Sequence, residues 1–260
     1  AESETVLDST EVAVVDPRIA YAWNDNPTIL GISVPDVEYS FNISAAANAF
    51  TRASAGVYNV SWTGLTVPPG AINAQFVTAY GNVAAGFCME DNWVTAQLTF
   101  RCFDQAGVAA DQSSTTLAIG SATFTGRSAF AWIDSPAASA EASATWRHHP
   151  LGLSIFSERV ATGSYVVRFA GLQRAAAGDR EGVVVNAYGC IPAVCQPGAP
   201  TSTATGLEVA VRCFDAAGTA VDTRYTILLV DGARSGARLG FALADQPATG
   251  CVHIHDTCGI

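Results

Sequence analysis

The chain reads Arg-Cys-Phe-Asp-Gln-Ala-Gly at residues 101–107 and Arg-Cys-Phe-Asp-Ala-Ala-Gly at residues 212–218. An apolar run leads into each copy and a second apolar run follows it, which predicts a strand, a tight turn and a strand. The Asp of each copy caps the turn with its side chain, and the Gly takes the positive φ that other residues resist. The same strand–turn–strand unit therefore occurs twice in the chain.

Three further landmarks are duplicated in the same order, at spacings of roughly 110 residues. They are Tyr21-Ala22-Trp23 with Phe130-Ala131-Trp132, residues 56–65 with residues 163–172, and Ala79-Tyr80-Gly81 with Ala187-Tyr188-Gly189. Four landmarks in one order indicate an internal duplication. We predict repeat one at residues 18–124 and repeat two at residues 127–235. An N-terminal arm at residues 1–17 precedes them, and a C-terminal partial repeat at residues 238–260 follows them.

The apolar residues of both repeats have the periodicity of strands. Tyr58, Val60 and Trp62 alternate with smaller or polar residues, as do the matching residues of repeat two, so each set shares one face of a half-buried strand. β-branched and aromatic residues dominate these runs, and Gly, Pro, Asn and Asp separate them. The sequence predicts an all-β fold of two tandem antiparallel β-sandwich domains with extra terminal strands.

Composition places the protein outside the cell. The 260 residues are 49% hydrophobic and carry a net charge of −10, which argues against nucleic acid and anionic membrane surfaces as partners. No apolar run reaches the roughly 20 residues that a membrane span needs. Seven cysteines favour an oxidising compartment, and the start at Ala1 suits a mature secreted chain, so we expect a secreted, extracellular protein.

Four of the cysteines occupy equivalent places in the two repeats. Because the duplication keeps both members of each pair, we predict the disulfides Cys88–Cys102 and Cys195–Cys213; the alternative is that these positions are small buried hydrophobes. The other three have no counterpart in repeat one, and their pairing within or between chains stays open. They are Cys190, Cys251 and Cys258.

These landmarks together resemble an uncharacterised tandem β-rich repeat of secreted proteins from high-GC bacteria. The resemblance rests on the aromatic-Ala-Trp, Ala-Tyr-Gly and Cys-Phe-Asp-x-x-Gly motifs and covers the chain except about a dozen residues at each end. It implies the fold and the tandem arrangement, and it implies no activity or catalytic residue. Repeat two departs from the pattern at residues 146–149 and at Cys190.

Candidate metal ligands are few. His253 and His255, with Asp256 nearby, have a spacing that suits part of a zinc or copper site, against the alternative of a solvated strand. Two aspartate pairs that bracket the repeated turns offer oxygen ligands for calcium, although turn formation explains the first member of each. These pairs are Asp104 with Asp111 and Asp215 with Asp222. No cofactor is expected as the leading interpretation.

The tryptophans divide into two groups. Trp23, Trp62 and Trp132 match aromatic residues of the other repeat, so we predict that they lie in the core. Trp93 and Trp146 lie outside the shared pattern, and either one, if exposed, offers a ring on which a sugar stacks.

No nucleophile elbow, phosphate-binding loop or His-Glu-x-x-His motif is present, so no catalytic residue is assigned. The leading hypothesis is a non-enzymatic structural or adhesive protein, such as a subunit of a surface assembly or filament. We expect it to self-associate by adding a terminal strand, from residues 11–15 or residues 238–260, to another subunit. For the strand in residues 238–260 the alternative is that it packs on repeat two of its own chain. The alternative is a module that binds carbohydrate or another small ligand. A secreted hydrolase is the third hypothesis.

Overall fold

The computed structural model describes residues 18–65, 73–80, 86–94, 96–121, 126–176, 179 and 181–231. These residues form strands joined by turns and short 3-10 helices, and their sheets close into no barrel. The predicted all-β fold class is confirmed. The predicted arm (residues 1–17) and partial repeat (residues 238–260) lie outside the described residues, and the domain bounds 18–124 and 127–235 stay a prediction.

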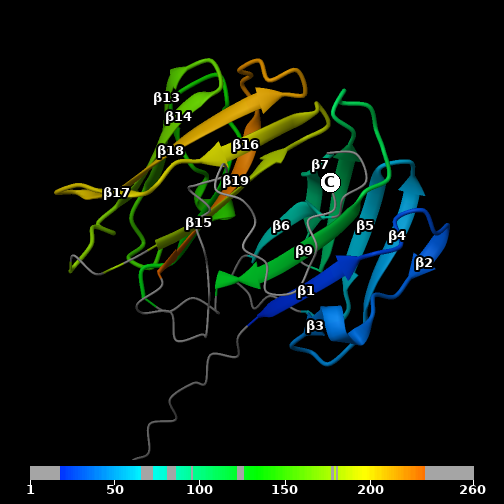
Figure 1. Ribbon diagram of the computed structural model, residues 1–260. Coiled ribbons are helices and arrows are strands. Elements are labelled where there is room, and N and C mark those ends of the chain that lie inside the picture. The colour runs from blue at the N-terminus through cyan, green and yellow to red at the C-terminus, as the bar shows by residue number, and fades with distance from the viewer. Residues whose placement is uncertain are drawn as a thin grey trace, which may run out of the picture.

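Repeat one is a sandwich of two sheets (Figure 1). Its elements are β1 (Ile19–Asn24), β2 (Gly31–Ser33), η1 (Val37–Tyr39), β3 (Ser40–Asn42), β4 (Asn48–Ser54), β5 (Val57–Trp62), β6 (Asn73–Tyr80), β7 (Phe87–Val94), β8 (Gln97–Phe103) and β9 (Ser113–Gly120). One sheet has the order β3-β1-β9-β6, and the strands of the other follow the order β7-β8-β5-β4-β2.

Repeat two has the same strand order in both of its sheets. Its elements are β10 (Ala129–Ile133), β11 (Ala140–Glu141), η3 (Ala144–Trp146), β12 (Arg147–His148), β13 (Ile155–Ala161), β14 (Ser164–Ala170), β15 (Glu181–Tyr188), β16 (Ala193–Pro197), β17 (Thr201–Ser202), β18 (Gly206–Asp215) and β19 (Arg224–Asp231). The orders are β12-β10-β19-β15 and β11-β13-β14-β18-β16, with β17 added beside β18.

The alternation that predicts the strands also fills the cores. The large residues expected to share one face are all buried: Tyr58, Val60 and Trp62 in β5, and Tyr165, Val167 and Phe169 in β14. Each set belongs to the main hydrophobic cluster of its own repeat. Burying one such side chain stabilises the fold by about 1.5–3 kcal/mol.

The repeated turn forms as the sequence predicts. The Oδ1 atom of Asp104 accepts hydrogen bonds from the backbone N–H groups of Ala106 and Val108, both at 2.9 Å. Gly107 ends the turn with a φ of +77°. Asp215 and Gly218 repeat this geometry in the second copy.

The structure contains the two disulfides that the sequence predicts. Cys88 of β7 and Cys102 of β8 are bonded, and they face each other directly across the two strands. Cys195 of β16 and Cys213 of β18 have the same relation in repeat two. Cys190 is exposed and has no disulfide partner among the described residues; Cys251 and Cys258 lie outside them.

A partly buried ion pair holds the end of each repeated turn. Arg52 donates to both carboxylate oxygens of Asp111, from Nε at 3.0 Å and from Nη2 at 2.9 Å. The same carboxylate accepts from the backbone N–H of Gly56 at 2.9 Å and from the hydroxyl of Tyr58 at 2.7 Å. In repeat two the same bonds join Asp222 to Arg159, Gly163 and Tyr165.

This network favours the ionised carboxylate. Partial burial alone would raise the pKa of Asp111, but the hydrogen bonds from Arg52, Gly56 and Tyr58 outweigh it and lower that pKa from 3.8 to about 2. The ionised carboxylate therefore stabilises the folded protein above the pKa of the unfolded chain, and this stabilisation is lost as the pH falls through about 2.

We expect Asp111→Asn to lower the free energy of unfolding of repeat one by about 2 kcal/mol at neutral pH, because it weakens several charge-assisted hydrogen bonds and leaves Arg52 without its counter-ion. Asp104→Asn is the matched control, and we expect a change of less than about 0.5 kcal/mol, since Asn also caps turns. Urea denaturation measures both. Equal effects of the two substitutions would contradict this role of Asp111.

The two repeats share one sheet (Figure 1). Edge strand β7 of repeat one runs parallel to edge strand β15 of repeat two, where the N–H of Gly189 donates to the carbonyl oxygen of Glu90 at 2.7 Å. The side chain of Asn186 in β15 donates to the carbonyl oxygen of Val77 in β6 at 2.7 Å and accepts from its N–H at 3.0 Å. The resulting nine-stranded sheet has the order β12-β10-β19-β15-β7-β8-β5-β4-β2.

Apolar packing and a buried acid complete this junction. Phe76 and Ile119 of repeat one form a cluster with Phe130 and Leu228 of repeat two. The side chain of Glu90 is completely buried, and its Oε2 atom accepts a hydrogen bond from the hydroxyl of Thr226 in β19 at 2.7 Å. Burial raises the pKa of Glu90 well above its usual value, and the contacts with Thr226 and Trp93 oppose this rise only in part.

The raised pKa means that Glu90 keeps its proton to a higher pH in the folded protein than in the unfolded chain. Its contribution to stability is therefore complete below the unfolded pKa of about 4.5 and decreases as the pH rises towards the folded pKa. We expect Glu90→Gln to flatten the stability profile above pH 4.5 and to raise the stability at pH 8. Between the unfolded and the folded pKa of Glu90, the wild type loses about 1.4 kcal/mol of stability for each pH unit, and the variant does not.

The measurement is the free energy of unfolding in urea at a series of pH values. Glu208→Gln, which removes an exposed carboxylate of a surface ion pair with Arg168, serves as the control and should leave the profile unchanged. A Glu90→Gln profile parallel to that of the wild type would show that Glu90 does not set the pH dependence.

Candidate functional site

Each repeat places three aromatic rings on the outer face of one sheet. In β1 the small residues Ala20 and Ala22 point into the core, so Tyr21 and Trp23 point outward. The predicted core position of Trp23 is therefore wrong, because this residue is half-buried on the outer face and belongs to none of the core clusters. Trp132 lies on the matching face of repeat two and is also half-buried, but it packs against the core cluster of repeat one instead of that of its own repeat. Alternation fixes this outcome, because a strand that buries its alanines turns the residues between them to the other side.

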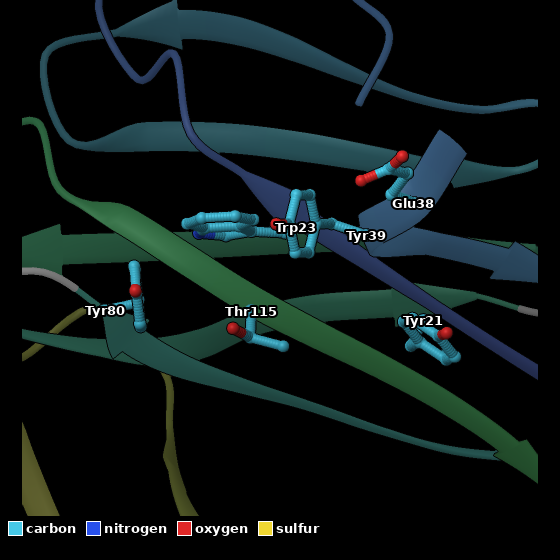
Figure 2. A pocket seen from close by; sticks show the side chains of 6 residues that line it. All are labelled: Tyr21, Trp23, Glu38, Tyr39, Tyr80 and Thr115. Atoms are coloured by element: carbon cyan, nitrogen blue, oxygen red, sulfur yellow. The ribbon is translucent and has the colours of Figure 1, made fainter. Parts of the chain in front are cut away.

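Two other elements complete the group in repeat one. Tyr80 ends β6, the strand of the Ala-Tyr-Gly landmark. Tyr39 ends the short helix η1, which Asp36 caps by accepting the N–H of Glu38 at 2.9 Å. The cap fixes the direction of the turn, which places Tyr39 beside Trp23 and Glu38 on the far side of Tyr39, where it also lines the pocket (Figure 2).

These side chains line an open aromatic pocket of about 560 Å³, which consists of Tyr21, Trp23, Glu38, Tyr39, Tyr80 and Thr115. The ring centroid of Trp23 lies 4.6 Å from that of Tyr39 and 4.9 Å from that of Tyr80, and the interplanar angles are 82° and 87°. Figure 2 shows the two tyrosine rings on either side of the indole. Tyr39 is 49% exposed and Tyr80 is 53% exposed, so solvent reaches the pocket.

The matching residues of repeat two form a covered aromatic pocket of about 250 Å³, lined by Asn92, Trp93, Trp132, Trp146 and Tyr188. Trp132, Trp146 and Tyr188 replace Trp23, Tyr39 and Tyr80. The centroid of Trp146 lies 5.1 Å from that of Trp93 at an interplanar angle of 87°, and Trp132 lies 5.2 Å from Tyr188. Burial raises the pKa of Tyr188, and the nearby Glu90 adds to this effect.

Trp93 comes from β7 of repeat one, so repeat one covers this pocket. Trp93 is only 8% exposed, which leaves it no free ring face for the predicted sugar stacking; Trp146 is 38% exposed. The structure thus brings together the two tryptophans that lie outside the shared pattern, and it places them in the junction. Among the described residues, no side chain of repeat two lines the open pocket in the way that Trp93 lines the covered one.

The two aspartate pairs considered as calcium ligands form no metal-binding group with other described residues in the structure. In the part of the chain that the structure describes, no group of three or more His, Cys, Asp or Glu side chains is arranged to hold a metal ion. Asp104 and Asp215 cap turns, and Asp111 and Asp222 bind arginines. His253, His255 and Asp256 lie outside the described residues.

Sequence reasoning missed Glu38, Tyr39, Tyr80 and Thr115 as site residues. The signal for Tyr80 was present, because it belongs to a duplicated landmark, and an outward-facing residue kept in both copies has no core role to explain it. Tyr39 and Trp146 occupy the same place in the repeat, and the exchange of one aromatic residue for another was a second signal.

Comparisons of the chain with protein-family models, with curated proteins and with solved structures give no match. None of the helices in the described residues is long and apolar enough to cross a membrane.

We expect Trp93→Ala to lower the free energy of unfolding by about 3–5 kcal/mol, because it removes a buried indole from the junction and leaves a cavity. Tyr39→Ala, on the exposed side of the open pocket, should cost less than about 1 kcal/mol. Urea denaturation followed by tryptophan fluorescence measures both. A small effect of Trp93→Ala would mean that the junction does not depend on this ring.

Proposed function

We propose that this chain is a non-enzymatic extracellular structural or adhesive protein that associates with further copies of itself through an apolar edge of repeat one. The observation that carries this proposal is the exposure of the apolar residues in 29–34, which read Ile-Leu-Gly-Ile-Ser-Val around β2 and carry no charge. Leu30 is 77% exposed and Ile32 is 74% exposed. Exposed apolar segments of this kind on monomers mark sites of association.

The position of β2 supports strand addition at this edge. β2 is the last strand of the nine-stranded sheet, and among the described residues it pairs only with β4. An edge strand presents backbone groups to which another strand can bond, and proteins usually protect such edges with charged residues. The donor strand in this proposal is residues 11–15 or a segment of residues 238–260 from another subunit.

Repeat two protects the matching edge. At the place of Val34 it has Glu141, which forms an ion pair with Arg147, and the flanking residues are small. A charged side chain on an edge strand opposes pairing with another strand. The contrast between the two repeats supports association through repeat one alone.

The junction supports a structural role for the pair of repeats. A shared sheet, an apolar cluster and a buried acid join the two sandwiches. Domains joined in this way move as one body, whereas domains joined by a flexible linker do not transmit force in a fixed direction. The disulfides fit an oxidising environment outside the cell.

The test is the mass of the full chain in solution over a wide range of concentrations, by light scattering after gel filtration. We expect the wild type to form larger species and the double variant Leu30→Asp with Ile32→Asp to stay a monomer, because the added charges oppose strand pairing. Val160→Asp is the control, since Val160 is a 61% exposed apolar residue of repeat two in β13, which belongs to a different sheet from β2. A monomeric wild type at high concentration would refute self-association.

The second candidate function is binding of carbohydrate or another small ligand. The open aromatic pocket favours it, because it combines aromatic faces with a carboxylate and a hydroxyl in a solvent-accessible hollow.

A further inference from the structure

The arrangement of the rings in the open aromatic pocket suits a compact group better than a flat one. Tyr39 and Tyr80 stand nearly perpendicular to Trp23 and close to it (Figure 2). A sugar ring that stacks on tryptophan needs a broad uncovered face, and the two flanking tyrosines restrict the access to this indole. A small rounded group, in contrast, touches the faces of several rings at once.

The electrostatics of the pocket favour a positive group. The face of an aromatic ring carries negative potential, and cations bind over it. Glu38 adds a carboxylate to the rim, and no Arg, Lys or His belongs to the lining residues. The net charge of the chain, −10, also attracts cations.

The covered aromatic pocket shows what lies against these rings in repeat two. Trp93 lines that pocket, and its ring stands perpendicular to that of Trp146 at 5.1 Å. Edge-to-face pairs of this kind place the positive edge of one ring on the negative face of the other. Trp93 carries no net charge. Thr145 of repeat two occupies the position of Glu38, so the carboxylate is present in the open copy and absent from the copy whose rings contact a neutral side chain.

The aromatic faces of the pocket favour a methylated ammonium group over a simple one. A primary ammonium is strongly hydrated and needs three acceptors for its N–H groups. The open pocket offers one exposed carboxylate and the hydroxyls of Thr115 and the tyrosines, and its other lining atoms belong to aromatic rings. A methylated ammonium has few or no donors to satisfy, and its methyl groups carry the positive charge to the ring faces.

From this geometry and charge we infer that the open aromatic pocket binds a quaternary ammonium group of the choline type, with Trp23, Tyr39 and Tyr80 around the methyl groups and Glu38 as the counter-charge. This inference rests on the second proposed function, that of a small-ligand-binding module, and it is independent of self-association through β2. The pocket is large enough for a trimethylammonium group on a short alkyl chain.

The test is a calorimetric titration of the full chain with choline chloride and, in parallel, with 3,3-dimethylbutan-1-ol, which has the same shape and no charge. We expect choline to bind and the neutral analogue to bind about tenfold more weakly, the difference that a cation–π contact and one counter-charge supply. Trp23→Phe, which keeps an aromatic ring and the fold, should weaken choline binding, and Trp23→Ala should abolish it. Circular dichroism checks that both variants are folded.

Two further arms separate the alternatives. Glu38→Gln should weaken choline binding severalfold and make it less sensitive to salt, whereas Glu208→Gln, which changes the net charge equally in repeat two, should leave binding unchanged. Equal binding of choline and its neutral analogue would overturn the cation site. Binding of mono- or disaccharides, lost in Trp23→Ala, without binding of choline would overturn this inference and leave the small-ligand function standing. Binding of neither class would overturn both.

Discussion

The contact between β7 and β15 is the constraint on which the rest of the molecule depends. One backbone hydrogen bond, from Gly189 to Glu90, fixes the two edge strands in parallel, and the side chain of Glu90 continues the same contact to Thr226. A buried acid in such a place is stable only as the neutral form or with good partners. Once β7 is held there, Trp93 must lie over the aromatic rings of repeat two.

This contact makes two similar sandwiches unequal. Repeat two uses its aromatic face to receive repeat one, while the same face of repeat one stays open. The edges differ as well, because β2 is flanked by large apolar residues, whereas β11 contains Glu141 and is flanked by small residues. A duplication thus supplies two copies of each surface, and the junction covers one copy of the aromatic face and leaves the other open to solvent.

Much of the fold follows from local patterns in the sequence. Alternation places Tyr58, Val60 and Trp62 in the core, and the Asp-x-x-Gly spacing forms the turn at residues 104–107, because each depends only on neighbouring residues. The disulfides follow from equivalence between the repeats. The sequence does not show on which side of the sheet Trp23 and Trp132 lie. The duplication indicates that the two positions share an environment, but this environment could be either the core or the outer face. The pairing of β7 with β15 depends on a few contacts between residues that are distant in the sequence, and the periodicity of the apolar residues does not indicate it.

The disulfides also set how far the chain extends under tension. Cys88–Cys102 closes a segment of 14 residues and Cys195–Cys213 one of 18. An extended chain spans about 3.4 Å per residue, so the bridges withhold about 50 Å of length from repeat one and about 60 Å from repeat two. A repeat that is pulled open while its disulfide is intact therefore lengthens less than its residue count allows. The strand that carries Glu90 and Trp93 also stays tethered to its neighbour β8, ready to pair again when the force is released.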